Sequence, residues 1–347
     1  MTFDTQKQNN TTYQNKLADY ERKLEQFKEQ HAVKSDTVTS SELNQQLKSA
    51  TQSDAVITVS NLNGMTEDTA YEASHSSGDN YDQTGAGAKS FIIPTGEGSL
   101  TATYSNLKNW SYEGKSITKI VYQIQTHKNM LSNVAQNQYD NSRNPSWNYF
   151  ALTLSKDPTR GFSYYGISVD VTMTMYYADG TPVNFEPDTA FFAVGSLNNY
   201  TNILNSSSIE TTKVNSGGKA LGLYGSSVTV HTGNVLYSTN PNTVYDNSTT
   251  TDTFNPNAHY TPNDGPKDWD INGSGKQYFG AGLIDLSGTS TSFTAQTILP
   301  NADKSMSYRN WAWWNATTVI PKTPGFQETP PTPKYSSINY HYDTNLI

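Results

Sequence analysis

The sequence predicts a mainly β protein, an antiparallel β-sandwich with long loops, preceded by the end of a helical stalk and followed by a polyproline segment. Helical periodicity is confined to the first fifty residues. Beyond them, short alternating and β-branched runs follow one another, separated by turns such as Ala178-Asp-Gly-Thr181. Only 34% of the 347 residues are hydrophobic and 16% are charged, with 23 Tyr against 12 Phe, which is typical of an exposed β protein with polar loops.

The first predicted element is a helix around residues 13–27. Its apolar side chains recur at spacings of four and three, as in a heptad seam: Tyr13, Leu17, Tyr20, Leu24 and Phe27. The pattern predicts the last turns of a helical stalk, and an ordinary amphipathic helix packed on the domain is the alternative. We expect Ser41 to Lys48 to add a second short helix.

Nine strands are predicted after the run that begins at Ala55, because no alternating helices interrupt the series and turns separate its members. They are Ser99–Tyr104, Ile117–Gln125, Tyr149–Leu154, Tyr164–Tyr177, Ala190–Val194, Ala220–Tyr224, Ser227–His231, Gly280–Leu286 and Ser292–Ile298. Three polar stretches are predicted as long loops, and two of them are expected to be functional: Asn199 to Gly218 and Asn240 to Lys276. The third is Thr66 to Ser90.

The richest candidate for a binding loop is Asp268 to Tyr278. Asp268, Asp270 and Asn272 alternate before Gly273, so that their oxygen atoms can converge, as in the first half of a calcium loop. Phe279 stands where an EF-hand would close with Glu, and no helical pattern flanks the loop, so it is not an EF-hand. The alternative is a solvated Asp/Asn/Gly turn.

The C-terminal part predicts further segments. Five prolines between residues 321 and 333 favour an extended polyproline segment, and Asn339-Tyr-His-Tyr342 resumes strand-like alternation. We therefore predict a stalk end at 1–50, a sandwich domain at 51–320, a proline-rich stalk at 321–335 and the start of a following β domain at 336–347. We expect the helical and proline-rich segments to leave the same end of the sandwich.

Charge and composition limit the classes of function. The net charge is −8, which repels phosphate backbones unless a local basic patch exists. The chain has no cysteine, which excludes disulfides, thiol catalysis and Cys-ligated zinc. No apolar run approaches the ~20 residues of a membrane span. The six histidines have no metal-binding spacing and there is no G-x-S-x-G motif, so we expect a binding protein and not an enzyme.

An ordered series of motifs resembles the V-domain shared by streptococcal antigen I/II adhesins, glucan-binding protein C and the enterococcal aggregation substance. The motifs span roughly Val56 to Ile320 and include Leu100-Thr-Ala-Thr-Tyr-Ser-Asn-Leu-Lys-Asn109, Asp157-Pro-Thr-Arg-Gly161, Tyr177-Ala-Asp-Gly-Thr-Pro-Val-Asn-Phe185, Ser208-Ile-Glu210 and Tyr278-Phe-Gly-Ala-Gly-Leu-Ile-Asp-Leu-Ser-Gly288. The resemblance implies a lectin-like sandwich held away from a Gram-positive cell wall as one part of a larger anchored protein. It also implies adhesion and aggregation through polymer binding in a cleft, and in some relatives a metal ion there.

The predicted site lies where three segments meet: Asp268 to Tyr278, Asn198 to Glu210, and Asn144 to Tyr149. The expected ligand contacts are Trp147, Asn198, Trp269, Asp270, Asn272 and Tyr278, with rings stacking on sugars and polar groups bonding hydroxyls. The alternative is that Trp147 and Trp269 are core anchors. For one calcium ion, the resemblance contributes Ser208 and Glu210, and Asp268 is added from the loop.

The predicted function is binding of polymeric glycans or glycoproteins. A first alternative is binding of polyanions, lipoteichoic acid or DNA, along a basic run that comprises Lys108, Lys115, Lys119, Lys128, Arg143, Lys156 and Arg160. A second alternative is a glycan-active enzyme with two carboxylates. We expect no membrane insertion by this segment.

Overall fold

The computed structural model describes residues 3–30, 37–38, 44–74, 86–129, 150–199, 201, 208–223, 226–241, 280–298, 311–317 and 330–333. The chain divides into two compact units, one of residues 1–35 with 324–347 and one of residues 36–323. In the described part of the chain, no helix is both long and apolar enough to cross a membrane.

In the first unit, residues Phe3–Gln30 form helix α1, which confirms the predicted helix. Its half-buried side chains include Tyr13, Leu17, Tyr20 and Leu24, so the predicted seam is also the less exposed stripe of the helix. Asp19 accepts hydrogen bonds from Arg22 and Lys23 on the exposed side, which supports the helix by pairs three and four residues apart. The placement of the stalk segments at one end of the sandwich stays a prediction.

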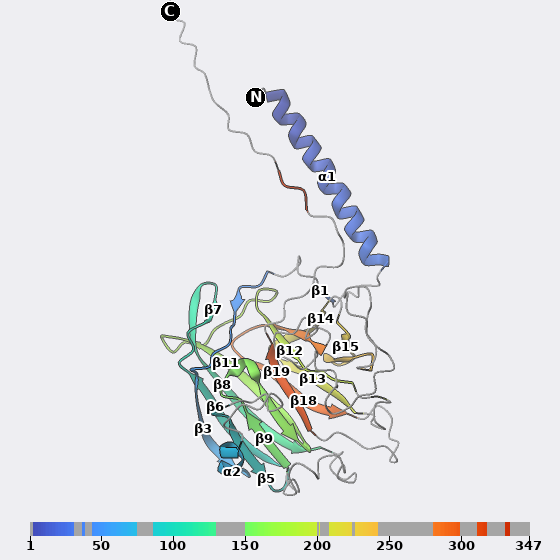
Figure 1. Cartoon of the computed structure of the whole chain (residues 1–347). Coiled ribbons are helices and arrows are strands. Elements are labelled where there is room, and N and C mark those ends of the chain that lie inside the picture. Colours follow the sequence, from blue (N-terminus) through green and yellow to red (C-terminus); the bar gives the residue numbers. More distant parts are fainter. Residues whose placement is uncertain are drawn as a thin grey trace, which may run out of the picture. The chain divides into compact units, whose positions relative to one another are not determined.

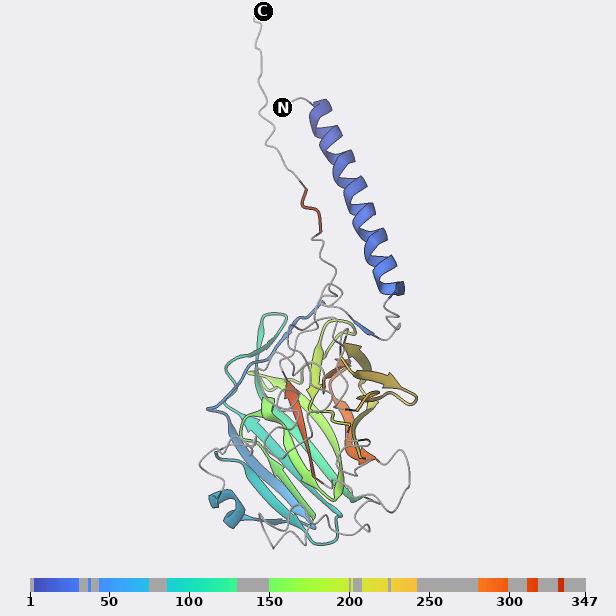
Figure 2. The same ribbon diagram turned by 45° about the vertical axis from the view of Figure 1, so that its right-hand side comes forward.

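The second unit contains a ten-stranded sheet (Figure 1). Its order is β15 (Val228–His231), β16 (Val235–Ser238), β13 (Ile209–Ser216), β18 (Thr291–Ile298), β11 (Ile167–Tyr177), β8 (Lys115–Lys128), β6 (Gly98–Ser105) and β3 (Val56–Asn63). β7 (Trp110–Tyr112) pairs with β8, and β2 (Leu47–Lys48) pairs with β7. All these pairs are antiparallel, and Figure 2 shows β3, β6, β8 and β11 side by side from a second direction.

The other sheet has nine strands. Its order is β1 (Thr37–Val38), β14 (Gly218–Leu223), β17 (Gly282–Leu286), β12 (Phe191–Gly195), β19 (Trp311–Thr317), β10 (Phe162–Tyr165), β9 (Phe150–Leu154), β5 (Lys89–Ile93) and β4 (Thr66–Glu67). Only the β1–β14 pair is parallel among these described strands. A short helix, α2 (Thr69–Ser74), follows β4, and Pro158–Arg160 form a 3-10 turn capped by Asp157.

The core lies between the two sheets because inward side chains alternate with outward ones along most strands. In β6 and β11, every second side chain is buried, and the intervening ones are partly exposed. One cluster joins residues of both sheets, such as Tyr122 and Val171 from the ten-stranded sheet and Leu152 and Phe162 from the other. The mainly antiparallel sandwich predicted from the sequence is thereby confirmed.

Each of the nine predicted strands has a counterpart, with one interruption. The run Tyr164–Tyr177 is divided between β10 and β11 at Gly166, which has φ 69° and carries the chain from one sheet to the other. A side chain there would meet the ring of Phe150, because an added Cβ would lie 2.8 Å from its Cδ1. Glycine therefore allows both the turn and the close packing.

Three predictions were wrong over the described residues. Asn199 to Gly218 is not one long loop, because Ile209–Ser216 form β13, an inner strand paired with both β18 and β16. The first four residues of β13, Ile-Glu-Thr-Thr, are all buried, as expected for an inner strand that is covered on both faces, and β-branched Ile and Thr favour strand structure. Nor does Ser41 to Lys48 form a helix over its described residues, because Leu47–Lys48 pair with β7 and Gln45 bonds the backbone of β12. The predicted Thr66–Ser90 loop likewise contains β4, α2 and the start of β5.

Candidate functional site

The structure brings together three of the predicted site residues: Asn198, Ser208 and Glu210. Asn198 follows β12, Ser208 precedes β13, and Glu210 is the second residue of β13. All three are buried, with 2%, 0% and 4% of their surface exposed. The other predicted contacts lie outside the described residues: Trp147, Asp268, Trp269, Asp270, Asn272 and Tyr278.

Backbone pairing joins the chain that leaves β12 to the start of β13, and we call this place the junction. The N–H of Glu210 donates to the carbonyl of Asn198 at 2.9 Å, and Asn199 forms an isolated bridge with Ile209. The positive φ of Ser196, 58°, turns the chain out of β12 into the junction. The two described ends of the segment between β12 and β13 therefore lie side by side.

The Glu210 carboxylate is the centre of the junction. Its Oε2 accepts hydrogen bonds from the backbone N–H of Asn198 at 3.2 Å and from Asn198 Nδ2 at 3.1 Å. Asn198 Nδ2 also lies 3.3 Å from the carbonyl of Ser196. The buried charge is thus held by amide donors, which is how a buried carboxylate avoids the full cost of desolvation. We call Ser196, Asn198, Asn199, Ser208 and Glu210 the junction cluster.

Neighbouring elements contact this junction cluster. Asn199 Nδ2 donates to the carbonyl of Ser238 in β16 at 2.9 Å. Burial, with the nearby charge of Glu210, raises the pKa of Tyr164 in β10 well above its usual range. The N–H of Leu197 donates to the carbonyl of Gly280 at 3.0 Å, so the residue that follows the Asp268–Phe279 segment lies against the junction. The junction cluster therefore links the end of β12 to β13, β16 and Gly280 through hydrogen bonds.

The calcium prediction can be compared with the donors present. Calcium takes six to eight oxygen ligands. Glu210 offers the one carboxylate of the junction cluster, and its Oε2 is already engaged by two amide donors. Among the described residues, no group of three or more His, Asp or Glu side chains could hold a metal ion. The described donors alone do not fit calcium, and the predicted third ligand, Asp268, lies outside them.

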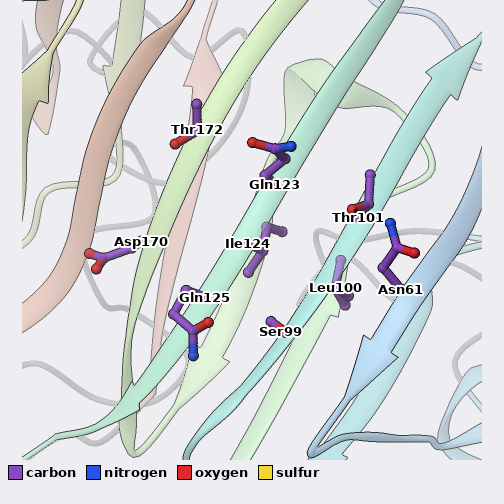
Figure 3. Close-up of a pocket in the computed structure, with 9 residues that line it drawn as sticks. All are labelled: Asn61, Ser99, Leu100, Thr101, Gln123, Ile124, Gln125, Asp170 and Thr172. Atoms are coloured by element: carbon purple, nitrogen blue, oxygen red, sulfur yellow. Dashed lines mark hydrogen bonds between the residues drawn. The ribbon is translucent and has the colours of Figure 1, made fainter.

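A second polar site lies on the outward face of the ten-stranded sheet, and it is absent from the sequence-based predictions. An open groove of about 290 Å³ crosses β3, β6, β8 and β11 (Figure 3). Figure 3 shows its polar side chains on one side of the ribbon. We call it the outer groove, and its lining residues are Asn61, Ser99, Leu100, Thr101, Gln123, Ile124, Gln125, Asp170 and Thr172. Leu100 and Ile124 are buried and belong to the core, so their backbone contributes to the floor.

Asp170 supplies the charge within this outer groove. It accepts a hydrogen bond from Thr294 Oγ1 in β18, and its Oδ2 lies 3.3 Å from His127 Nε2. The other ring nitrogen of His127 lies 3.0 Å from Glu97. The backbone N–H of Lys128, together with the His127 ring, holds the pKa of Glu97 below its usual range. The carboxylate of Asp170 is consequently oriented by its neighbours.

Four members of the predicted basic run, Lys108, Lys115, Lys119 and Lys128, do not form one strip, and Arg143 lies outside the described residues. Lys108 pairs with Asp54, and Lys115 pairs with Asp179 at 3.1 Å. Lys119 lies over the ring of Tyr176, with 4.2 Å from Nζ to the ring centroid. Lys115 and Lys128 lie at opposite ends of β8, roughly 40 Å apart at about 3.3 Å per residue. Within the described residues, these cations are therefore dispersed.

Comparison with solved structures identifies the same fold. The chain matches glucan binding protein C of Streptococcus mutans with a TM-score of 0.57 and 18% identity, over 96% of each chain. It matches the adhesin domain of PrgB from Enterococcus faecalis with a TM-score of 0.55 and 16% identity, over 84% of this chain and 94% of that one. The same domain bound to DNA gives 0.54 and 17%, over 82% and 98%.

The family model named "Glucan-binding protein C" matches residues 5–317, which include both sheets. The match also agrees with the V-domain motifs in the sequence. This chain therefore belongs to the glucan-binding protein C family.

Proposed function

We propose that this protein is a cell-surface adhesin domain that binds polymeric glycans. The observation that carries the proposal is the family match over residues 5–317. The glucan binding protein C of Streptococcus mutans is described as mediating sucrose-independent and sucrose-dependent adherence. We place the domain on the surface of a Gram-positive cell, as part of a larger wall-anchored protein, and assign it no catalytic role.

The described surface suits a neutral ligand. The outward face of β6, β8, β11 and β18 carries Thr, Ser and Gln side chains, which offer both donors and acceptors to sugar hydroxyls. A glycan held in this way needs no desolvated ion pair, so its binding is expected to change little with ionic strength. The predicted aromatic contacts, Trp147, Trp269 and Tyr278, would add stacking at the sandwich end.

A second candidate is binding of polyanions, because the related PrgB adhesin domain has a structure bound to DNA. Against it stand the net charge of −8 and the dispersed lysines. A protein that neutralises several phosphates would lose affinity steeply with salt, by about 10³ or more between 50 and 200 mM for six contacts. Salt dependence therefore separates the two candidates.

The test measures binding of the full chain to dextran, to lipoteichoic acid and to duplex DNA by titration calorimetry at 50 and 300 mM NaCl. We expect dextran affinity to change less than about twofold, because neutral hydrogen bonds are scarcely screened. Binding only to the polyanions, with loss at high salt, would replace the glycan proposal. Release of shorter sugars from dextran would contradict the non-catalytic assignment.

A further inference from the structure

We propose that the outer groove is itself a binding site for a segment of neutral polysaccharide, separate from the predicted loop site. The inference rests on the proposed function in that both require a neutral glycan. It adds the location and the selectivity of the site: hydroxyl-rich neutral chains are accepted and polyanions are rejected.

The wall of the outer groove is formed by an irregularity in β3. Pairing between β3 and β6 shifts between Ser60 and Asn63, and Asn61 has φ 52°. A positive φ is uncommon outside glycine but is tolerated by Asn, and bulges of this kind re-aim side chains. Asn61 Nδ2 donates to Thr101 Oγ1 at 3.2 Å, so the amide is fixed over β6 at the side of the outer groove. The backbone distortion thus makes a boundary on an otherwise regular sheet.

The charge of the outer groove selects against anions. No Lys or Arg belongs to its lining, and Asp170 contributes a negative charge. Phosphate-bearing polymers would have to approach this carboxylate without a counter-charge from the lining, which is unfavourable. Sugar hydroxyls can donate to a carboxylate, so the same group is favourable for a neutral glycan. The held orientation of Asp170, between Thr294 and His127, reduces the freedom lost on binding.

Several polar groups of the outer groove are available to a ligand. Gln123 and Thr172 are direct cross-strand partners, and within the described residues neither side chain makes a hydrogen bond. Gln125 is also exposed, and its Nε2 makes a long 3.3 Å contact to the carbonyl of Thr126. Adjacent strands lie about 4.8 Å apart and alternate residues about 6.8 Å apart, so these groups form a regular array on one face. An extended sugar chain can bond such an array at successive rings.

We expect the outer groove of a single protein molecule to bind a glycan weakly. No aromatic ring lines it, so stacking does not contribute, and each exchanged hydrogen bond adds only about 1 kcal/mol net. Useful adhesion would come from many copies engaging one polymer. The site is therefore suited to reversible capture of a long chain and not to tight binding of a single sugar.

The test compares two double variants of the full chain. Gln123→Ala with Thr172→Ala removes the paired groups of the outer groove. Gln296→Ala with Thr174→Ala is the matched control, because it removes the same residue types from β18 and β11 on the same face, outside the lining. Binding of dextran, a neutral glucan, is measured by titration calorimetry, and unfolding midpoints are measured alongside.

We expect the groove variant to raise the Kd for dextran about tenfold, the effect of losing roughly two weak hydrogen bonds. The control should change it less than about twofold. Equal Kd values for wild type and groove variant would overturn this inference and leave the proposed function intact. Failure of the wild type to bind dextran would overturn both. Displacement of dextran by DNA from the wild type but not from the groove variant would show a polyanion site instead.

As a second variant, Thr101→Arg introduces bulk and positive charge into the lining without touching the core. It should abolish the contribution of the outer groove to dextran binding. Dextran binding unchanged in a correctly folded Thr101→Arg protein would contradict the inference independently of the Ala variants.

Discussion

The junction cluster and the outer groove use similar residue types in opposite ways. In the junction cluster, the Glu210 carboxylate is buried and receives two amide hydrogen bonds from Asn198. In the outer groove, the Asp170 carboxylate and the Gln123 amide lie on a sheet face that is open to solvent. The first arrangement uses its polar groups to hold strands together, whereas the second keeps them available for a ligand.

The difference shows that a polar residue indicates function only together with its exposure and its partners. Ser208 and Glu210 carry the family motif, yet both are buried within the fold. Gln123 belongs to no family motif, and its side chain is exposed in the outer groove, where a polymer can reach it. Substitutions at the two places should accordingly separate stability from binding.

The largest effect is expected from Glu210→Ala. It removes two buried hydrogen bonds between Asn198 and a carboxylate and leaves the Asn198 donors only their 3.1 and 3.3 Å contacts with Ser196, which should lower the free energy of unfolding by about 3 kcal/mol. Urea unfolding of the purified protein measures this change. Glu210→Gln keeps one acceptor oxygen and should lose less. Equal stability of Glu210→Ala and wild type would show that the junction cluster does not hold the strands.

A smaller effect concerns a second buried carboxylate. Burial raises the pKa of Asp285 in β17, even though its Oδ1 accepts from the N–H of Asp188 at 3.0 Å. Because the folded-state pKa exceeds the unfolded one, about 3.9, ionisation costs stability as pH rises through the interval between the two values. Asp285→Asn keeps the acceptor and removes the charge.

The stability of Asp285→Asn relative to wild type should therefore increase from pH 4 to pH 7, by about 1 kcal/mol for each unit by which the pKa is raised. Urea unfolding at both pH values gives the difference. A relative stability that stays constant or falls with pH would contradict this prediction. It would mean that ionisation of Asp285 costs no stability, as expected for a carboxylate on a face open to solvent, such as Asp170.

The smallest stability effect is expected in the outer groove. Gln123→Ala with Thr172→Ala removes one exposed and one partly exposed side chain without described hydrogen bonds, so the free energy of unfolding should change by less than about 0.5 kcal/mol. Thermal unfolding checks this result. A loss comparable to that of Glu210→Ala would assign these residues to the structure of the sheet and remove the contrast.

The sequence predicted the sandwich and most of its long strands, but it did not predict the outer groove or the strand β13. Alternation identified β6, β8, β11 and β18 because buried residues, most of them apolar, alternate there with exposed or partly exposed ones. It missed β13 because polar Glu210 and Thr212 face inward there, which resembles a loop by composition. Hydrogen bonds to Asn198 make that burial tolerable, and such long-range partners have no local signal.

The outer groove was missed for a different reason. Its residues come from four strands, and each strand alone reads as an ordinary solvated face. Only the pairing register places Thr101 beside Gln123 and Gln123 beside Thr172. The bulge at Asn61 gives one usable hint, because Asn61-Leu-Asn-Gly64 interrupts the alternation of β3. The aromatic loop site, Trp147, Trp269 and Tyr278, stays a prediction.

The most direct measurement is nuclear magnetic resonance of the side-chain amide groups during titration with a short neutral dextran fragment. The amides of Asn61, Gln123 and Gln125 report on the outer groove, and the buried amide of Asn198 reports on the junction cluster. We predict shifts at the three groove amides that saturate together, with none at Asn198. Shifts at Asn198 with unchanged groove amides would contradict the account and place the glycan at the junction cluster.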